Sequence, residues 1–435
     1  SIKCSSSCIT IYRRKRTSKM IDFRLALINS SWMFLIQIMN YLLPLIVLPA
    51  QISALGLAGM GELAFFSAIL YFLNLLVNFG FNTFATDQIS KNAQDSVVCN
   101  EIYFGVQVIR LIILLVVTIG LILIANILLT RESATLLISL AGLLIGNFLN
   151  PIWIYQGLQK LKFFAIATFI GRLFLAISIL LLIRKEDDLI LCAVLISASS
   201  LITGLISTLY IKIGLQLKFK TCGVEKIISL TLRSFPLLVS NIVTQGYSGL
   251  TPIMFGALYS VELLGMYSIA ERLINAAINI RNGILQSLFP QFSKMTDHRK
   301  KRLTTSRTIL IVTMIMCFMV LFIYRLDIYI LSVFISDADS LQTTHIMLTL
   351  MLVKLFFSSL NVVLGHLYLA TSGLNTSILT STIIGLAWAA IICALAATSM
   401  LQNAYTFVFL IGCTEVIVFL SLLYFFLKTK EQPIG

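Results

Sequence analysis

Charged side chains are scarce in this sequence of 435 residues, where they make up 11% while hydrophobic residues make up 58%. Soluble globular domains carry roughly a quarter charged residues. No soluble core of this length can bury so much apolar surface, which gives a mean hydropathy of +0.97. We therefore expect the lipid bilayer to be the solvent for most of the chain. The composition also leaves no room for the soluble ATPase of a nucleotide-driven pump.

Histidine is rare as well, and His298, His345 and His366 are dispersed along the chain. The sequence has no phosphate-binding glycine loop, no Gly-x-Ser-x-Gly motif and no zinc-ligand spacing. The eight cysteines are scattered, and only Cys4 and Cys8 lie close together, without a nearby histidine. We therefore predict no enzyme activity, no catalytic residues, no metal site and no cofactor.

Long apolar runs, in contrast, are abundant. Barrel strands would alternate in polarity over about ten residues, whereas the runs here are continuous over the roughly 20 residues that a spanning helix needs. The sequence therefore predicts an all-α polytopic membrane protein with about 12 transmembrane helices. We place these spans near residues 28–49, 61–83, 104–127, 135–156, 164–183, 189–211, 230–256, 266–290, 307–325, 342–368, 377–399 and 406–427.

The net charge of +14 is distributed as in a membrane protein and not as in a nucleic-acid-binding protein. With the N-terminus placed inside, the inner segments hold 22 lysines and arginines and the outer segments hold 4. This asymmetry is the positive-inside pattern, and no nucleic-acid-binding motif accompanies it. We predict a bacterial inner-membrane protein with cytoplasmic N- and C-termini and no nucleic-acid partner.

A weak internal repeat divides the chain into two halves of six spans. Leu55-Gly56 and Leu264-Gly265 each precede a span that contains polar residues. Repeats of six spans share one orientation, so a pseudo-twofold axis along the membrane normal would relate them. We expect a basic segment at 1–27, six-helix bundles at 28–211 and 230–427, a cytoplasmic linker at 212–229 and a tail at 428–435. Residues 1–19 are interpreted as an extension upstream of a functional start at Met20, with a basic anchor on anionic lipid as the alternative.

The span at 266–290 carries the strongest signal for function. At 100° per residue, six of its polar side chains fall within a stripe about 80° wide. Amides that faced lipid would each forfeit hydrogen bonds, so the stripe must face protein or water. We expect it to line a cavity, with helix–helix hydrogen bonding as the alternative. The stripe consists of Ser268, Glu271, Asn275, Asn279, Asn282 and Gln286.

Basic residues outnumber acidic ones inside the predicted spans. A centrally placed Arg or Lys costs about 2.5–3.5 kcal/mol, so these side chains should face an interior. A positive interior suits an anionic cargo, because guanidinium groups bind phosphate oxygens bidentately. Interfacial snorkelling and structural ion pairs are the alternatives for each cation. The cations are Arg110, Arg172, Arg272, Arg281 and Lys354; the acids are Glu271 and Glu415, which could bind a coupling ion or form salt bridges.

Four motifs, in order along the chain, resemble bacterial polysaccharide flippases of the Wzx type. Asn78 departs from the acidic residue usual in the first motif, so we expect no ion-coupling role there. The resemblance covers roughly residues 20–428. The motifs are Asn78-Phe79-Gly80-Phe81 with Ala85-Thr86, the Pro-Ile-Trp-Ile-Tyr-Gln-Gly-Leu-Gln-Lys stretch at 151–160, Ser234-Phe235-Pro236, and the Leu-Gly-Met-Tyr-Ser-Ile-Ala-Glu-Arg stretch at 264–272.

This resemblance implies two six-helix bundles around a central cleft, in the superfamily that includes multidrug extruders and peptidoglycan-lipid flippases. It implies translocation of an undecaprenyl-pyrophosphate-linked O-antigen repeat unit from the cytoplasmic to the periplasmic leaflet by alternating access. Membrane lipids, an O-antigen polymerase and a chain-length regulator are the other implied partners. Arg272, with Arg281 or Lys354, would hold the pyrophosphate, while Asn275, Asn279, Asn282 and Gln286 would bind sugar hydroxyls.

Two other functions compete with this interpretation. A cation-coupled multidrug extruder of the same superfamily would favour an acidic cavity, which the net positive interior argues against. A membrane-embedded O-antigen polymerase or acyltransferase would need a long catalytic outer loop or a histidine-centred pair. The longest outer connection, about residues 326–341, contains three aspartates but no such constellation.

Overall fold

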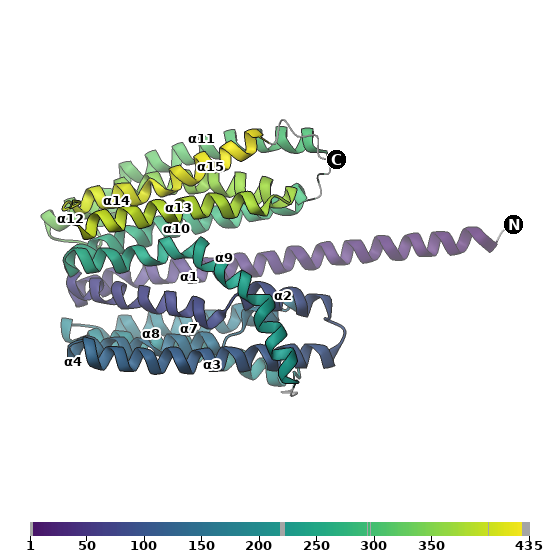
Figure 1. The fold of residues 1–435 in the computed structure, drawn as a ribbon, viewed down its shortest axis with the longest axis horizontal. Helices are drawn as coiled ribbons and strands as arrows, with labels where there is room; N and C mark the ends of the chain where they lie inside the picture. The colour runs from purple at the N-terminus through teal and green to yellow at the C-terminus, as the bar shows by residue number, and fades with distance from the viewer. Residues whose placement is uncertain (1–2, 218–221, 294, 296, 399, 429–435) are drawn as a thin grey trace.

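The computed structural model is a bundle of long helices, with no strand among the residues it describes (Figure 1). It describes the backbone of residues 3–217, 222–293, 295, 297–398 and 400–428. Side chains are described for these residues except 3–31, 33, 34, 37, 38, 41, 42, 247, 248, 283, 284, 286, 287, 289–291, 293, 298 and 375.

The helices gather into two bundles, which lie one above the other in Figure 1. The N-terminal bundle contains α1 (Lys3–Asn78), α2 (Phe81–Lys91), α3 (Ser96–Leu128), α4 (Arg131–Leu140), α5 (Gly142–Phe148), α6 (Ile152–Gly157), α7 (Leu161–Leu182) and α8 (Leu189–Ile213). The C-terminal bundle contains α10 (Val261–Ser293), α11 (His298–Ser332), α12 (Ala338–Asn361), α13 (Asn375–Ala397), α14 (Ala404–Gly412) and α15 (Thr414–Lys428). Between α12 and α13 lie a π-helical segment, Val362–Leu369, and a short 3₁₀ turn, Ala370–Ser372.

The predicted fold class is confirmed. Ten stretches within the described residues are long and apolar enough to cross a membrane. Many of their apolar side chains are exposed on α3 and α11, as expected for surfaces that face lipid. The polar helix α10 is not among the ten stretches, and the count of about 12 transmembrane helices remains a prediction.

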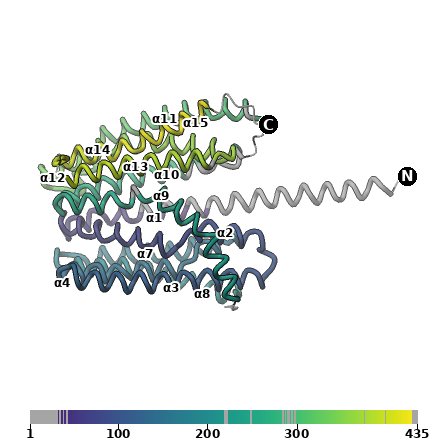
Figure 2. Tube along the Cα trace, in the orientation of Figure 1, coloured from purple at the N-terminus to yellow at the C-terminus, as the bar shows by residue number. Residues whose placement is uncertain are grey.

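The helix α9 (Val224–Leu258) connects the two bundles. It begins inside the predicted linker at 212–229, where Lys226 forms an ion pair with Glu101 of α3. Figures 1 and 2 show it running obliquely from the ends of α2 and α3 toward α13, and it contacts all three helices. Its first half therefore packs on the N-terminal bundle, although the sequence assigned it to the C-terminal one.

Two spans are interrupted where the sequence suggested simple boundaries. In α1, Gly56 adopts φ 68° and ψ 178°, a conformation that a residue without Cβ tolerates, and the kink separates the first two predicted spans. The predicted span at 135–156 lies within one candidate membrane span, Arg131–Gly157, which is built from three short helices, α4, α5 and α6. Pro151 lies in the second break, between α5 and α6. Proline interrupts the helix there because it lacks the N–H that a continuous helix would use.

Aspartates fix the starts of three helices. Asp95, Asp297 and Asp337 cap α3, α11 and α12 by accepting hydrogen bonds from backbone N–H groups of the first turn. Hydrogen bonds from the side chain and the backbone of Ser340 lower the pKa of Asp337. These caps lie at helix ends, where charged groups still reach water.

Candidate functional site

A cavity of about 630 Å³ lies between the two bundles, and we call it the inter-bundle cavity. Helices from both halves of the chain supply its walls, since α1 contributes from one side and α9, α10 and α12 contribute from the other. It is lined by Ala64, Ser67, Ala68, Tyr71, Gly249, Pro252, Ser268, Glu271, Arg272, Asn275, Asn279 and Lys354.

Two of the predicted cations meet in this cavity. Lys354 of α12 lies 3.6 Å from Glu271 of α10, measured from Nζ to Oε1. Arg272 directs its guanidinium toward α1, with one terminal nitrogen 3.5 Å from Oε1 of Gln51. Gln51 is nearly fully buried and donates in turn to the sulfur of Cys192 on α8. The charged lining side chains therefore sum to one net positive charge, and Arg272 connects the bundles.

The polar stripe of α10 faces the cavity over its first three turns. Ser268, Asn275 and Asn279 are all lining residues. The Ser268 hydroxyl donates to the carbonyl of Gly265, and the Asn279 amide donates to the carbonyl of Asn275. Asn282 is half-buried and does not line the cavity, while the side chain of Gln286 lies outside the described ones.

Two glycines close one end of the cavity. Gly61 precedes Ala64 of α1 by one turn, and Gly265 precedes Ser268 of α10 by one turn. A Cβ added at Gly61 would overlap the backbone carbonyl of Val261, and one added at Gly265 would overlap that of Leu57. The two backbones therefore pack directly against each other, which only glycine permits here. We call this contact the glycine crossing.

Arg281 and Glu415 lie elsewhere, inside the C-terminal bundle. The Arg281 side chain is 6% exposed, and its guanidinium donates to the carbonyl oxygen of Ser358 at 2.8 Å. Glu415 is 7% exposed and accepts a 2.7 Å hydrogen bond from the Asn361 amide. Neither residue lines the inter-bundle cavity, so the structure does not bring them together with Arg272 and Lys354.

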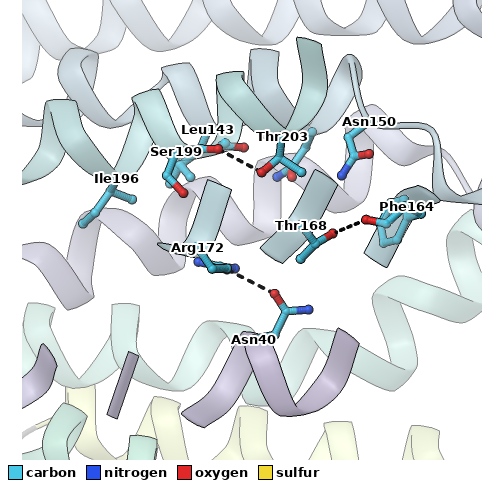
Figure 3. Close-up of a pocket in the computed structure, with 11 residues that line it drawn as sticks. Asn40, Leu143, Asn150, Phe164, Thr168, Arg172, Ile196, Ser199 and Thr203 are labelled. Carbon is cyan, nitrogen blue, oxygen red and sulfur yellow. Dashed lines mark hydrogen bonds between the residues drawn. The ribbon is translucent and has the colours of Figure 1, made fainter. Parts of the chain in front are cut away.

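Arg172 lies in a second, partly open cavity of about 410 Å³ within the N-terminal bundle, called the chamber below. Its Nε donates to Oδ1 of Asn40 at 3.1 Å, as Figure 3 shows. Eight of the eleven lining residues are polar, and none is acidic. The chamber is lined by Asn40, Leu143, Asn147, Asn150, Phe164, Thr168, Arg172, Ile196, Ser199, Ser200 and Thr203.

Arg110 lines neither cavity and serves the protein backbone. Its side chain is 1% exposed, and its terminal nitrogens donate to the carbonyl oxygens of Asn147 and Phe148 at 2.9 and 3.2 Å. Asn147 is four residues before Pro151, so its carbonyl lacks the donor of a regular α-helical turn and accepts instead from the N–H of Asn150 at 3.3 Å. Arg110 therefore stabilises the break before α6, with further bonds to Gln107 and Asn78.

Several polar residues in or behind the wall of the inter-bundle cavity were not predicted from the sequence. Gln51 and Tyr71 have polar groups inside apolar stretches, a signal that single residues give only weakly. Tyr71 donates to Gln245 of α9 at 2.8 Å, and Tyr267 donates to Glu271 at 3.4 Å. The asparagines of the chamber gave a clearer signal for a polar interior than Gln51 and Tyr71 did, because asparagines within spans should face an interior. Among the described residues, no group of three metal-ligating side chains could hold a metal ion.

Two helical bundles with a polar, positively charged cavity between them are typical of polytopic membrane transporters. The chain belongs to the polysaccharide biosynthesis protein family, whose model matches residues 26–296, more than half of the sequence. This match confirms the predicted resemblance to Wzx-type flippases.

Curated relatives point the same way. A putative O-antigen transporter of Escherichia coli (strain K12) is 24% identical over 267 residues. The alignment spans 61% of this chain and 64% of that relative, so less than two thirds of the relative's length is matched. The relative is named as a transporter, in agreement with the prediction that the chain is not an enzyme.

Solved structures share the fold. The lipid II flippase MurJ in an inward closed conformation superposes with a TM-score of 0.76 at 13% identity, covering 94% of this chain and 88% of that one. An inward-facing multidrug resistance transporter of the MATE family superposes with a TM-score of 0.71 at 16% identity, covering 92% and 96%. At such identities the likeness concerns the fold alone.

Proposed function

We propose that this protein is a flippase that moves undecaprenyl-pyrophosphate-linked O-antigen repeat units across the bacterial inner membrane. The observation that carries the proposal is one cavity in which Arg272 and Lys354 lie beside the amides of Asn275 and Asn279. A pyrophosphate requires cationic donors, and a saccharide requires groups that both donate and accept hydrogen bonds. The family membership and the O-antigen transporter relatives support the same cargo.

The proposal assigns a role to the lining residues and to the two charged residues outside the cavity. Arg272 and Lys354 bind the pyrophosphate, while Ser268, Asn275 and Asn279 bind sugar hydroxyls and the lipid tail remains in the bilayer. Arg281 sits deeper in the C-terminal bundle and acts on a later position of the anion or on helix packing. Glu271 is a site for a coupling ion, since it already faces Lys354; Glu415, paired with Asn361, is a second such site.

Alternating access follows from the glycine crossing. With cytoplasmic termini, the starts of the second and eighth predicted spans lie on the periplasmic side, and Gly61 and Gly265 stand at these starts. The crossing is then the closed outer end of the passage. Both inward conformations among the structural neighbours are consistent with this state. Separation of α1 from α10 opens the cavity outward.

A cation-coupled drug extruder shares the fold but fits the cavity less well. Cationic drugs favour acidic linings, and here Glu271 is the one acidic residue among the described lining side chains, opposed by two cations. The O-antigen polymerase and the chain-length regulator are proposed partners of the flipped product.

The test is a charge substitution at the best-placed cation. Arg272→Ala abolishes surface O antigen at unchanged protein level, and Arg272→Lys partly restores it, because an ammonium keeps the charge without the bidentate geometry. Arg131→Ala, at the exposed start of α4, is the matched control and retains full activity. Normal surface O antigen in the Arg272→Ala strain would remove this residue from the mechanism.

A further inference from the structure

We propose that the chamber of the N-terminal bundle is a second saccharide site, separate from the inter-bundle cavity. The proposal rests on the proposed function for the identity of the ligand, a sugar carried on a lipid. None of the eleven residues that line the chamber also lines the inter-bundle cavity. A ligand bound there would contact α1, α5, α7 and α8.

The lining side chains match hydroxyl groups better than a bare ion. Without a carboxylate among the described lining residues, the chamber offers nothing to balance a cation. Arg172 supplies one guanidinium, which also binds Asn40, but three of the hydroxyl protons that an anion would need are already committed to backbone carbonyls. Thr168 donates to Phe164, Ser199 to Gly171 and Thr203 to Ser199, at 2.7–2.9 Å. Each hydroxyl oxygen keeps lone pairs that accept from a ligand O–H.

The carboxamides complete the pattern. Asn40, Asn147 and Asn150 each carry one acceptor oxygen and two N–H donors, so they can satisfy a hydroxyl in either direction. The Oδ1 atom of Asn150 is buried and has no hydrogen-bond partner. A buried acceptor without a donor calls for a ligand or water. Figure 3 shows Asn150, Thr168 and Thr203 around one space, with Phe164 at its edge as an apolar face for a sugar ring.

The broken helix explains how this site exists at membrane depth. Irregular backbone within a bilayer is tolerated only where protein or a cavity satisfies it. Arg110 supplies donors to the carbonyls of Asn147 and Phe148, and Thr208 donates to the carbonyl of Leu149 at 2.6 Å. Arg110 and Thr208 are therefore positioning residues, which leave the side chains of Asn147 and Asn150 directed at the chamber.

The experiment locates a sugar directly. Full-length protein in lipid nanodiscs is exposed to farnesyl pyrophosphate that carries one N-acetylglucosamine with a photoreactive diazirine on the sugar. Mass spectrometry then maps the adducts. We expect adducts within residues 143–150, 164–172 or 196–203, and competition by free N-acetylglucosamine but not by inorganic phosphate. Adducts confined to α10, or suppressed by phosphate alone, overturn the proposal.

Two near-isosteric variants test the chamber with little risk to folding. Asn150→Leu and Asn40→Leu remove hydrogen-bonding groups without adding much volume, and both should lower the chamber adducts at least about fivefold, the worth of one hydrogen bond. Asn126→Leu is the matched control, because Asn126 lies exposed on α3 and donates only to the carbonyl of Ile122. Unchanged adducts in both chamber variants would show that these carboxamides do not bind the sugar, and would overturn the proposal.

A separate measurement distinguishes this proposal from the proposed function. Binding of farnesyl pyrophosphate without a sugar depends on Arg272 and not on Asn150. If the sugar-free compound binds and Arg272→Ala weakens it, but no chamber adduct forms, the second site alone is wrong. If the sugar-free compound does not bind to the wild-type protein, the proposed function fails together with this inference.

Discussion

Lys354 and Glu271 face each other across the inter-bundle cavity, with 3.6 Å between Nζ and Oε1. Both side chains are 16% exposed, so solvent screens the pair only partly. An incoming pyrophosphate and the carboxylate of Glu271 would therefore compete for the same ammonium group. Under the proposed function, this competition would allow Glu271 to release the cargo.

Glu271→Gln should strengthen binding of an anionic lipid. The substitution raises the net charge of the described lining residues from one to two positive charges, which favours an anion. We expect the affinity for farnesyl pyrophosphate to rise about three- to tenfold, while the rate of transport falls because release slows. Isothermal titration in nanodiscs measures the affinity. Glu262→Gln, at the exposed start of the same helix, is the control, and weaker binding in Glu271→Gln would contradict the competition.

Gly265→Ala should open the outer end of the cavity. The added methyl group would overlap the carbonyl of Leu57, and overpacking of this kind costs about 1–3 kcal/mol. That cost falls only on the crossed state, so the population of the outward-open state should increase roughly five- to a hundredfold. A membrane-impermeant maleimide measures this as faster labelling of an Asn275→Cys reporter from the periplasmic side.

The control for the crossing is another glycine in a helix. Gly120 of α3 has no neighbouring atom within 4 Å of an added Cβ, so Gly120→Ala should leave the labelling rate unchanged. Equal labelling rates in Gly265→Ala and Gly120→Ala would show that the crossing does not gate the cavity.

Arg110→Met should destabilise the N-terminal bundle. The substitution removes the charged donors of the carbonyls of Asn147 and Phe148 and of the amide oxygen of Asn78. Buried acceptors that lose a charged donor cost about 1.5–3 kcal/mol each, so we expect a loss of at least about 2 kcal/mol. Thermal unfolding in detergent gives the change in Tm. Arg131→Met, at an exposed helix start, should shift Tm little, and a similar shift in both variants would argue against this role.

Thr208→Val tests the same break from another side. Thr208 donates to the carbonyl of Leu149, and valine keeps the shape of the side chain without the donor. We expect about 1 kcal/mol of destabilisation and a moderate loss of transport. Thr135→Val, whose hydroxyl bonds only within the exposed end of α4, should behave as the wild type in both assays.

The sequence predicted the fold class and the inward-facing side of α10 because both depend on local composition. A helix of the bilayer needs a long apolar run, and the polar side chains from Ser268 to Asn279 had to face inward whatever they contacted. The sequence did not predict which side chains these residues would contact. Periodicity places a side chain on a face of one helix but does not give the helix opposite, so Arg110, Arg172 and Arg281 were assigned to the same anion as Arg272. The structure distributes them among three locations.

The kink in α1 and the break before α6 could not be predicted from the sequence either. Pro151 is visible as a helix breaker, but Trp153 and Tyr155 continue the apolar pattern beyond it, and a single span fits that pattern equally well. Only the bonds from Arg110 and Thr208 reveal that the break is maintained. Gly56 likewise looked like part of a connection, whereas one residue with φ 68° suffices to separate two helices.

The burial of Arg110 in α3 has a consequence for biogenesis. A charge at this depth opposes insertion by about 2.5–3.5 kcal/mol, and the seven apolar residues 111–117 that follow it recover about 2–4 kcal/mol. Of its acceptors, Asn78 and Gln107 are synthesised before or with α3, but Asn147 and Phe148 emerge from the ribosome later. The nascent chain must therefore shelter a half-satisfied guanidinium until the fourth span arrives, which makes this interval the natural point for a membrane chaperone or a quality-control protease to act.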